Sequence, residues 1–176
     1  MTLSLTLFRP FVFAALLVAG TPPLPADDWP QWRGPQRDGV WRETGIVEKF
    51  SSHQLQPVWT APVGPGYSGP TVAGDRVYLT DRVNEPAPQE RVRCFDRSTG
   101  KPLWTHTYPC VYRDIDYALG PRAAVTVVDG RAFAYGAMGN AHALDAASGQ
   151  VLWARDLATE YGVKLNVWAV SGAPLV

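Results

Sequence analysis

The chain has 176 residues, of which 16 are Lys or Arg and 16 are Asp or Glu, so its formal net charge at neutral pH is zero. It has no basic run or stripe that could neutralise a row of phosphates, which argues against nucleic acid and anionic membrane surfaces as partners. Once a targeting segment is set aside, the remaining length is that of one domain of ordinary size.

The first 26 residues have the pattern of a secretory signal peptide. Arg9 precedes the apolar run FVFAALLVAG, and Ala26 provides a small residue at a cleavage position. The apolar run is shorter than the ~20 residues that a membrane-spanning helix needs. We therefore predict an exported protein, periplasmic or extracellular, with no stable membrane anchor after cleavage.

Residues 27–56 form an N-terminal segment rich in tryptophan, with Trp29, Trp32 and Trp41. Two interpretations are compatible with this composition. The three rings could form a sugar-binding aromatic surface, or the segment could pack across a folded unit. We favour packing, because large aromatic side chains contribute most to stability when they are buried.

From residue 57 to residue 176 the chain is a series of short strand-like runs rich in Val, Tyr, Phe, Leu and Ala, separated by Gly, Asp and Asn turn signals. The runs form two sets of four, at about 64–108 and 122–157. The sets align strand for strand when the polar segment 84–90 is counted as a longer hairpin loop. Each set is therefore predicted to be one unit of four antiparallel strands.

Pieces of two more units flank these sets. SGAPLV at 171–176 resembles SGPTVAG at 68–74, which predicts that another unit begins at about 171. Upstream, Trp59 in PVWTAPV matches Trp104 in PLWTHTY, which predicts the last strand of a preceding unit. We expect these 176 residues to be the N-terminal part of a longer protein.

One nine-residue phrase occurs in both sets, as DRSTGKPLW at 96–104 and as DAASGQVLW at 145–153. The Asp can accept hydrogen bonds from turn N–H groups, the hydroxyl residue can reinforce the turn, and the Gly allows a positive φ. The Trp then presents a large flat surface on the outermost strand. The predicted structural motif comprises Asp96, Thr99, Gly100 and Trp104 in the first copy and Asp145, Ser148, Gly149 and Trp153 in the second.

This phrase resembles the tryptophan-docking motif of quinoprotein-type propellers. The phrase DWPQWRGPQRDGV, within residues 27–40, is similar to the start of exported PQQ-binding-like β-propeller repeat proteins of the quinoprotein alcohol dehydrogenase-like superfamily. The resemblance implies an all-β fold of propeller blades, each with four antiparallel strands, of which about two to three are present. It also implies that each motif Trp wedges against a neighbouring blade.

A PQQ-dependent dehydrogenase of this kind would need a Ca²⁺ site made of carboxylate and amide oxygens, with an Asp base beside the quinone. We identify no catalytic, cofactor-binding or metal-binding residue and expect no cofactor, with PQQ and Ca²⁺ as the alternative. Carboxylates in polar loops are usually only solvated. The loop oxygens that could reach a central channel belong to Asp114, Asp116, Asp156, Glu160 and Asn166.

The cysteines and histidines do not indicate a reactive centre. Cys94 occupies the position of Ala143 in the second unit, which favours a small buried residue over a redox thiol. A disulfide between Cys94 and Cys110 is compatible with export but is not implied, because the loop after Pro109 would have to fold back. The histidines are too widely spaced to indicate a zinc site; they are His53, His106 and His142.

We therefore predict an exported, non-catalytic scaffold or binding module with an unidentified protein or cell-envelope partner. The alternatives are a fragment of a PQQ-dependent oxidoreductase and a glycan-binding module. Loops held by a rigid scaffold are where recognition residues concentrate. The first places to look are the predicted connections 112–122 and 156–170.

Overall fold

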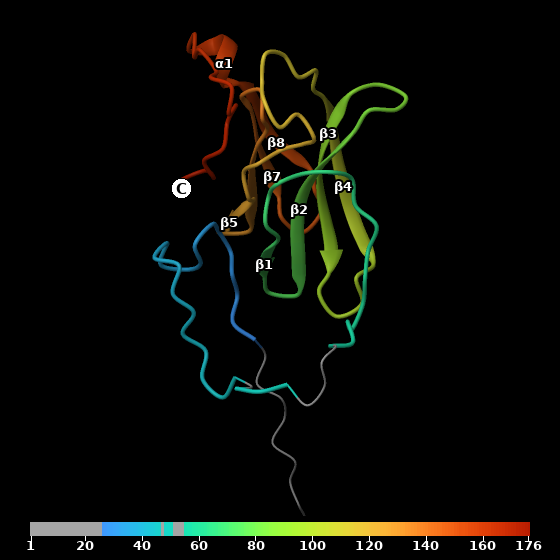
Figure 1. Cartoon of the computed structure of the whole chain (residues 1–176), viewed down its shortest axis with the longest axis vertical. Helices are drawn as coiled ribbons and strands as arrows, with labels where there is room; N and C mark the ends of the chain where they lie inside the picture. The colour runs from blue at the N-terminus through green and yellow to red at the C-terminus, as the bar shows by residue number, and fades with distance from the viewer. Residues whose placement is uncertain (1–25, 47, 51–54) are drawn as a thin grey trace, which may run out of the picture.

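The computed structural model describes residues 26–46, 48–50 and 55–176, so residues 1–25 of the predicted signal peptide, and His53, lie outside the described residues. The described part forms two four-stranded antiparallel sheets and one short helix (Figure 1). This confirms the predicted all-β class and the four-stranded blades. No helix in these ranges is long and apolar enough to cross a membrane.

The strands follow one another in each sheet, so every connection within a blade is a hairpin. Asp129 and Gly130, with φ values of 47° and 71°, form a two-residue turn of the kind that matches the twist of antiparallel strands. Blade A contains β1 (Thr71–Ala73), β2 (Arg76–Val83), β3 (Gln89–Asp96) and β4 (Pro102–Pro109). Blade B contains β5 (Thr126–Val128), β6 (Arg131–Tyr135), β7 (Asn140–Asp145) and β8 (Val151–Asp156), and α1 (Leu157–Glu160) follows it.

The two blades share one register. Cys94 lies opposite Trp104 in blade A, and Ala143 lies opposite Trp153 in blade B. In each blade the register between the last two strands shifts directly after this pair. Extra residues in a strand bend it and increase its twist. The motif Trp therefore takes the same place on the outer strand of both blades.

A hydrogen bond recurs at the first strand of each blade, β1 and β5, which we call the inner strands; β4 and β8 are the outer strands. Thr71 Oγ1 at the start of β1 donates to Val125 O at 2.6 Å, and Thr126 Oγ1 at the start of β5 donates to Pro174 O at 2.9 Å. Residues 171–176 form no strand themselves. Pro174 therefore contacts the start of β5 in the same way that Val125, just before β5, contacts the start of β1.

The N-terminal segment runs along the inner strands of both blades. Trp29 exchanges two backbone hydrogen bonds with Val72 of β1, and Val127 N of β5 donates to Pro30 O at 2.8 Å. The packing expected of this segment is therefore present at Trp29. It is absent at Trp32 and Trp41, whose side chains are 58% and 59% exposed, because the chain leaves the sheets after Pro30.

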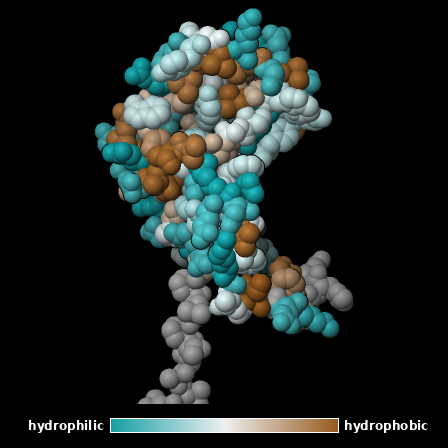
Figure 2. All heavy atoms as spheres, turned by 90° about the vertical axis from the view of Figure 1, so that its left-hand side faces the viewer, coloured by the Kyte–Doolittle hydropathy of each residue, from teal (hydrophilic) through white to brown (hydrophobic). Residues whose placement is uncertain are grey.

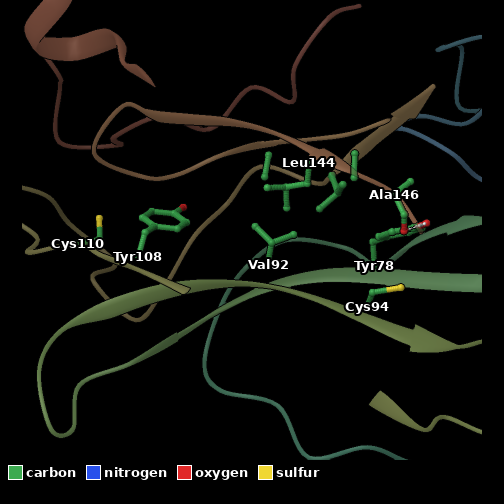
Figure 3. Close-up of a cluster of buried hydrophobic side chains, with 10 residues drawn as sticks. Tyr78, Val92, Cys94, Tyr108, Cys110, Leu144 and Ala146 are labelled. Carbon is green, nitrogen blue, oxygen red and sulfur yellow. Dashed lines mark hydrogen bonds between the residues drawn. The ribbon is translucent and has the colours of Figure 1, made fainter. Parts of the chain in front are cut away.

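The main core lies between the blades (Figure 3). Blade A contributes large side chains, among them Tyr78, Val92 and Tyr108, while blade B contributes Leu144 and several alanines. Large side chains facing small ones allow the two sheets to approach closely and fill the space between them. The interface holds the connecting loops of the two blades in a fixed relation.

Candidate functional site

The outer edges of the blades are joined through the repeated motif. The Trp104 indole N–H donates to Ala146 O at 3.1 Å, and an added Cβ on Gly149 would lie 2.6 Å from the Trp104 ring. Tyr78 O–H donates to the same carbonyl oxygen at 3.1 Å. Only a residue without a side chain leaves room for the ring at this point.

The same contact occurs one unit earlier. The Trp59 indole N–H donates to Arg97 O at 2.8 Å, and its ring lies over Gly100 so closely that a Cβ there would overlap it. Residues 57–63 form no strand in the structure. Trp59 nevertheless contacts the Arg97–Gly100 turn of blade A in the same way that Trp104 contacts the Ala146–Gly149 turn of blade B.

The two aspartates of the motif hold their turns through one oxygen each. Asp96 Oδ1 accepts from Thr99 N at 2.8 Å and from Thr99 Oγ1 at 2.7 Å, and Asp145 Oδ1 accepts from the equivalent groups of Ser148 at 2.8 Å and 2.7 Å. Hydrogen bonds from the hydroxyls of Ser98 and Thr99 lower the pKa of Asp96 to about 2. The Ser148 hydroxyl likewise lowers the pKa of Asp145.

The last motif residue, Trp153, has a different environment. Its ring lies 6.2 Å from the ring of Phe133 and is 45% exposed. Among the described residues no turn packs on it. The eight motif residues therefore lie at two joints and one open edge, and none of them lines the cavity between the loops that is described below.

A buried carboxyl group joins the blades near the loops. Glu90 of β3 is fully buried; its Oε2 accepts from Tyr108 O–H at 2.6 Å, and its Oε1 accepts from Tyr112 O–H and from Ala137 N at 3.1 Å. Burial raises the pKa of Tyr108 well above its ordinary value, so its hydroxyl remains a donor. Ala137 belongs to the β6–β7 turn, so Glu90 fixes blade B to blade A.

Spacing along the chain did not single out Glu90, although a signal was present. In QERVRCFD, Glu90 alternates with Val92 and Cys94, so a period of two places all three on one face of the strand. A Glu in line with two buried apolar residues indicates a buried carboxyl group with partners from elsewhere.

A cavity of about 480 Å³ opens beside this joint. Its wall contains one guanidinium group and two carboxyl groups, together with apolar side chains. The lining residues are Pro109, Cys110, Val111, Arg113 and Asp114 from the end of β4 and the loop after it; Asp156, Ala158, Thr159, Val163 and Leu165 from the end of β8, α1 and the loop after α1; and Met138 and Asn140 from the β6–β7 turn and the start of β7. The structure therefore brings the two predicted recognition loops together around one hollow.

The five loop residues considered as Ca²⁺ ligands do not converge on one site. The Asp156 carboxyl group accepts from Thr159 N at 3.0 Å and from Thr159 Oγ1 at 2.8 Å, and so caps α1. Within the part of the chain that the structure describes, no three His, Cys, Asp or Glu side chains are grouped as a metal site requires. Of the others, Asp114 lines the cavity, Asp116 N bonds Val167 O, Glu160 pairs with Arg155, and Asn166 Oδ1 accepts from Trp168 N.

Three exposed aromatic rings, Tyr67, Tyr117 and Trp168, gather in the loops that precede the inner strands. We call them the aromatic cluster. The rings of Tyr117 and Trp168 are stacked with centroids 5.5 Å apart, and Tyr67 meets Tyr117 edge-on at 6.4 Å. The side chains are 43% to 61% exposed. Figure 2 shows apolar patches between hydrophilic ones on the side of the molecule that carries α1 and the C-terminal segment.

The backbone that carries the aromatic cluster is held in place. Tyr117 has a φ of 52°, which costs a non-glycine residue free energy. The strained conformation is held by Arg122 Nη2, which donates to Tyr117 O at 3.0 Å. Asp116 N donates to Val167 O at 2.8 Å and so ties the two loops together.

The cysteines are both buried and unbridged. They lie at opposite ends of the interblade core (Figure 3). Cys94 is opposite Trp104 and Cys110 follows β4, which at ~3.4 Å per strand residue separates them by about 20 Å. At this separation the two residues are not expected to form a disulfide. Burial raises the pKa of Cys110 to about 12, so a reactive thiolate is not expected there.

Comparison with known families identifies the repeat. A family model described as "Outer membrane protein assembly factor BamB" matches residues 88–176, half of the chain. The match covers β3 and β4 of blade A and the whole of blade B. No curated protein matches the chain.

Several solved structures match part of this chain. BamB from Moraxella catarrhalis is 24% identical, with a TM-score of 0.34, over 49% of this chain and 22% of that protein. A europium-containing methanol dehydrogenase is 23% identical, with a TM-score of 0.46, over 66% of this chain and 19% of that one. For the quinohemoprotein alcohol dehydrogenase from Comamonas testosteroni the values are 22%, 0.43, 64% and 16%. The chain spans about a fifth of the length of these proteins.

Proposed function

The chain belongs to the family described as outer membrane protein assembly factor BamB, and on that premise we propose that it is an exported, non-catalytic propeller module that binds a protein partner through its loops. The observation that carries this proposal is the convergence of two loops from neighbouring blades around one cavity, next to an exposed aromatic cluster.

The chemistry of this loop surface favours a protein partner. Exposed Tyr and Trp with a neighbouring Arg are the residue types that dominate the energetics of protein interfaces. The cavity holds charges of both signs, from Arg113, Asp114 and Asp156, and its volume of about 480 Å³ suits one or two side chains of a partner. The partner would place an apolar segment on the aromatic cluster and polar side chains in the cavity.

The loops are also preorganised. The threonine bonds at the inner edge, the Trp contacts at the outer edge and the Glu90 bonds between them fix the angle between the blades. A surface that is already in its binding conformation loses little conformational entropy when a partner binds.

Affinity purification from cell-envelope extracts with the full-length protein tests the proposal. The variant Tyr117→Ser with Trp168→Ser removes the stacked pair, and Trp32→Ser removes an equally exposed ring from the N-terminal segment as a matched control. We expect a partner that the wild type and the control retain and that the loop variant loses. Equal recovery by all three proteins would contradict a role for the loops.

The same proteins separate the remaining interpretations. Loss of binding by the Trp32 variant alone, on insoluble glycans, would favour glycan recognition by the N-terminal segment. PQQ and Ca²⁺ are added to the full-length protein, and dye reduction is followed with alcohols and aldose sugars. Stoichiometric quinone binding with turnover would contradict the binding-module proposal and identify a PQQ-dependent oxidoreductase.

A further inference from the structure

Two histidines from different blades face each other in the interblade interface. His106 of β4 and His142 of β7 are 36 residues apart in the chain, yet His106 Nε2 lies 3.2 Å from His142 Nδ1. His142 is buried, with 6% of its surface exposed, and its Nε2 has no hydrogen-bond partner. The Tyr108 ring lies against both imidazoles, with its centroid 4.1 Å from that of His142 and 5.7 Å from that of His106.

Among the described residues, no carboxyl group forms a hydrogen bond or an ion pair with either imidazole. His106 is opposite Val92 in the sheet, and His142 lies between Ala134 and Ala154. The carboxylate of Glu90 accepts hydrogen bonds from Tyr108 O–H, Tyr112 O–H and Ala137 N. Arg155, next along β8, pairs with Glu160 and has a side chain that is 62% exposed.

Protonation of such a pair has two distinct costs. With both rings neutral, one nitrogen donates and the other accepts, so the hydrogen bond between blades is satisfied. A first proton leaves that bond intact but places an imidazolium charge in a buried interface without a carboxylate partner. A second proton makes both facing nitrogens donors, and the bond becomes a repulsion.

We propose that His106 and His142 form a proton-sensitive joint, which holds blade A to blade B while both imidazoles are neutral and weakens the interface when they take up protons. The two imidazoles contact the ring of Tyr108, whose hydroxyl group donates to Glu90 near the loop cavity. Acid therefore loosens the interface next to the loops, independently of which partner the loops bind.

The direction of the pH effect follows from the folded-state pKa values. Burial and the neighbouring His106 lower the pKa of His142 from 6.5 to about 4, and burial lowers that of His106. A lowered histidine pKa means that the unfolded chain binds protons more readily, so stability is complete above pH 6.5 and declines as the pH falls towards 4. Asp38 and Asp96, with pKa values of about 2, titrate below this window.

Urea unfolding of the full-length protein, followed by circular dichroism in buffers with EDTA, tests the joint. From about pH 7.5 to about pH 5.0 the wild-type unfolding constant should rise about 30-fold from His142 alone. His142→Phe keeps an aromatic ring beside Tyr108 but cannot titrate at that position, so its unfolding constant should rise several-fold less than that of the wild type over that range, with His106 as the remaining shifted histidine. EDTA ensures that no cation bridging the two rings masks the titration.

Leu144→Val is the matched control, because it weakens the same interface from the same strand without changing a titratable group. It should lower the urea midpoint at every pH and keep the wild-type pH dependence. An equal pH dependence in the wild type and in His142→Phe would overturn the proposal. So would an NMR titration in which the His142 ring protonates near pH 6.5 or above.

Discussion

Substituting Gly149 by Ala tests whether the contact with Trp104 holds the blades together. The Gly149 φ of +74° makes Ala unfavourable by about 1 kcal/mol from the backbone alone. The added Cβ would also lie 2.6 Å from the Trp104 ring, so the ring or the turn must move. Overpacking of this kind costs about 1–3 kcal/mol. We expect a total loss of stability of about 2–4 kcal/mol.

Gly130→Ala separates the two contributions. Gly130 lies in the same blade with a φ of +71°, and a Cβ there has no neighbour within 4 Å. Its substitution should therefore cost only the backbone contribution of about 1 kcal/mol. Both variants are unfolded in urea and followed by circular dichroism, in the wild-type background and with Trp104→Ala.

The excess cost of Gly149→Ala over Gly130→Ala is the free energy assigned to the overlap, and it should vanish when Trp104 is absent. If the two glycine variants lose equal stability within about 0.5 kcal/mol, the contact does not hold the joint. If the excess persists with Trp104→Ala, it arises from the turn and not from the neighbouring blade.

Three further predictions concern buried and turn residues. Glu90→Ala leaves two buried donors and one partly buried donor without an acceptor and should cost about 3 kcal/mol or more in urea unfolding, whereas Gln89→Ala should cost less than about 1 kcal/mol. Cys94 and Cys110 should react with a thiol reagent only after unfolding, and a native protein that labels at once, or a disulfide found between them by mass spectrometry, would contradict the buried thiols described here. The lowered pKa of Asp96 contributes stability that is present above pH 3.8 and lost as the pH falls towards 2, so Asp96→Asn should weaken the dependence of thermal unfolding on pH in that range, and an unchanged dependence would refute the role of its hydrogen bonds.

The regular parts of the fold could be predicted because their determinants are local. Turn chemistry such as Asp129-Gly130 and the alternation of apolar residues act within a few positions, and the repeat then carries the assignment from one blade to the next. The pairing of Cys94 with Trp104 follows from hairpin register in the same way.

The contacts between blades could not be predicted in the same way. His106 meets His142 only because two sheets pack face to face, and neither residue belongs to the nine-residue phrase that both blades share. The aromatic cluster is a similar case, since Tyr117 and Trp168 come from loops of different lengths that share no motif. Contacts between side chains of different blades depend on the angle between the blades, so they can be identified only once that angle is known.

The tryptophans and threonines that join the units all donate to main-chain carbonyl oxygens. Arg97 and Ala146, one long and charged and the other small, accept the same indole hydrogen bond. The hydrogen bond therefore places no demand on the side chain of the receiving residue, since any residue supplies the carbonyl group, and packing alone restricts the buried Ala146. Over evolution the blades of one chain can lose sequence similarity to each other much faster than they lose their mutual fit, and duplicated units can drift apart in sequence without a matching loss of assembly.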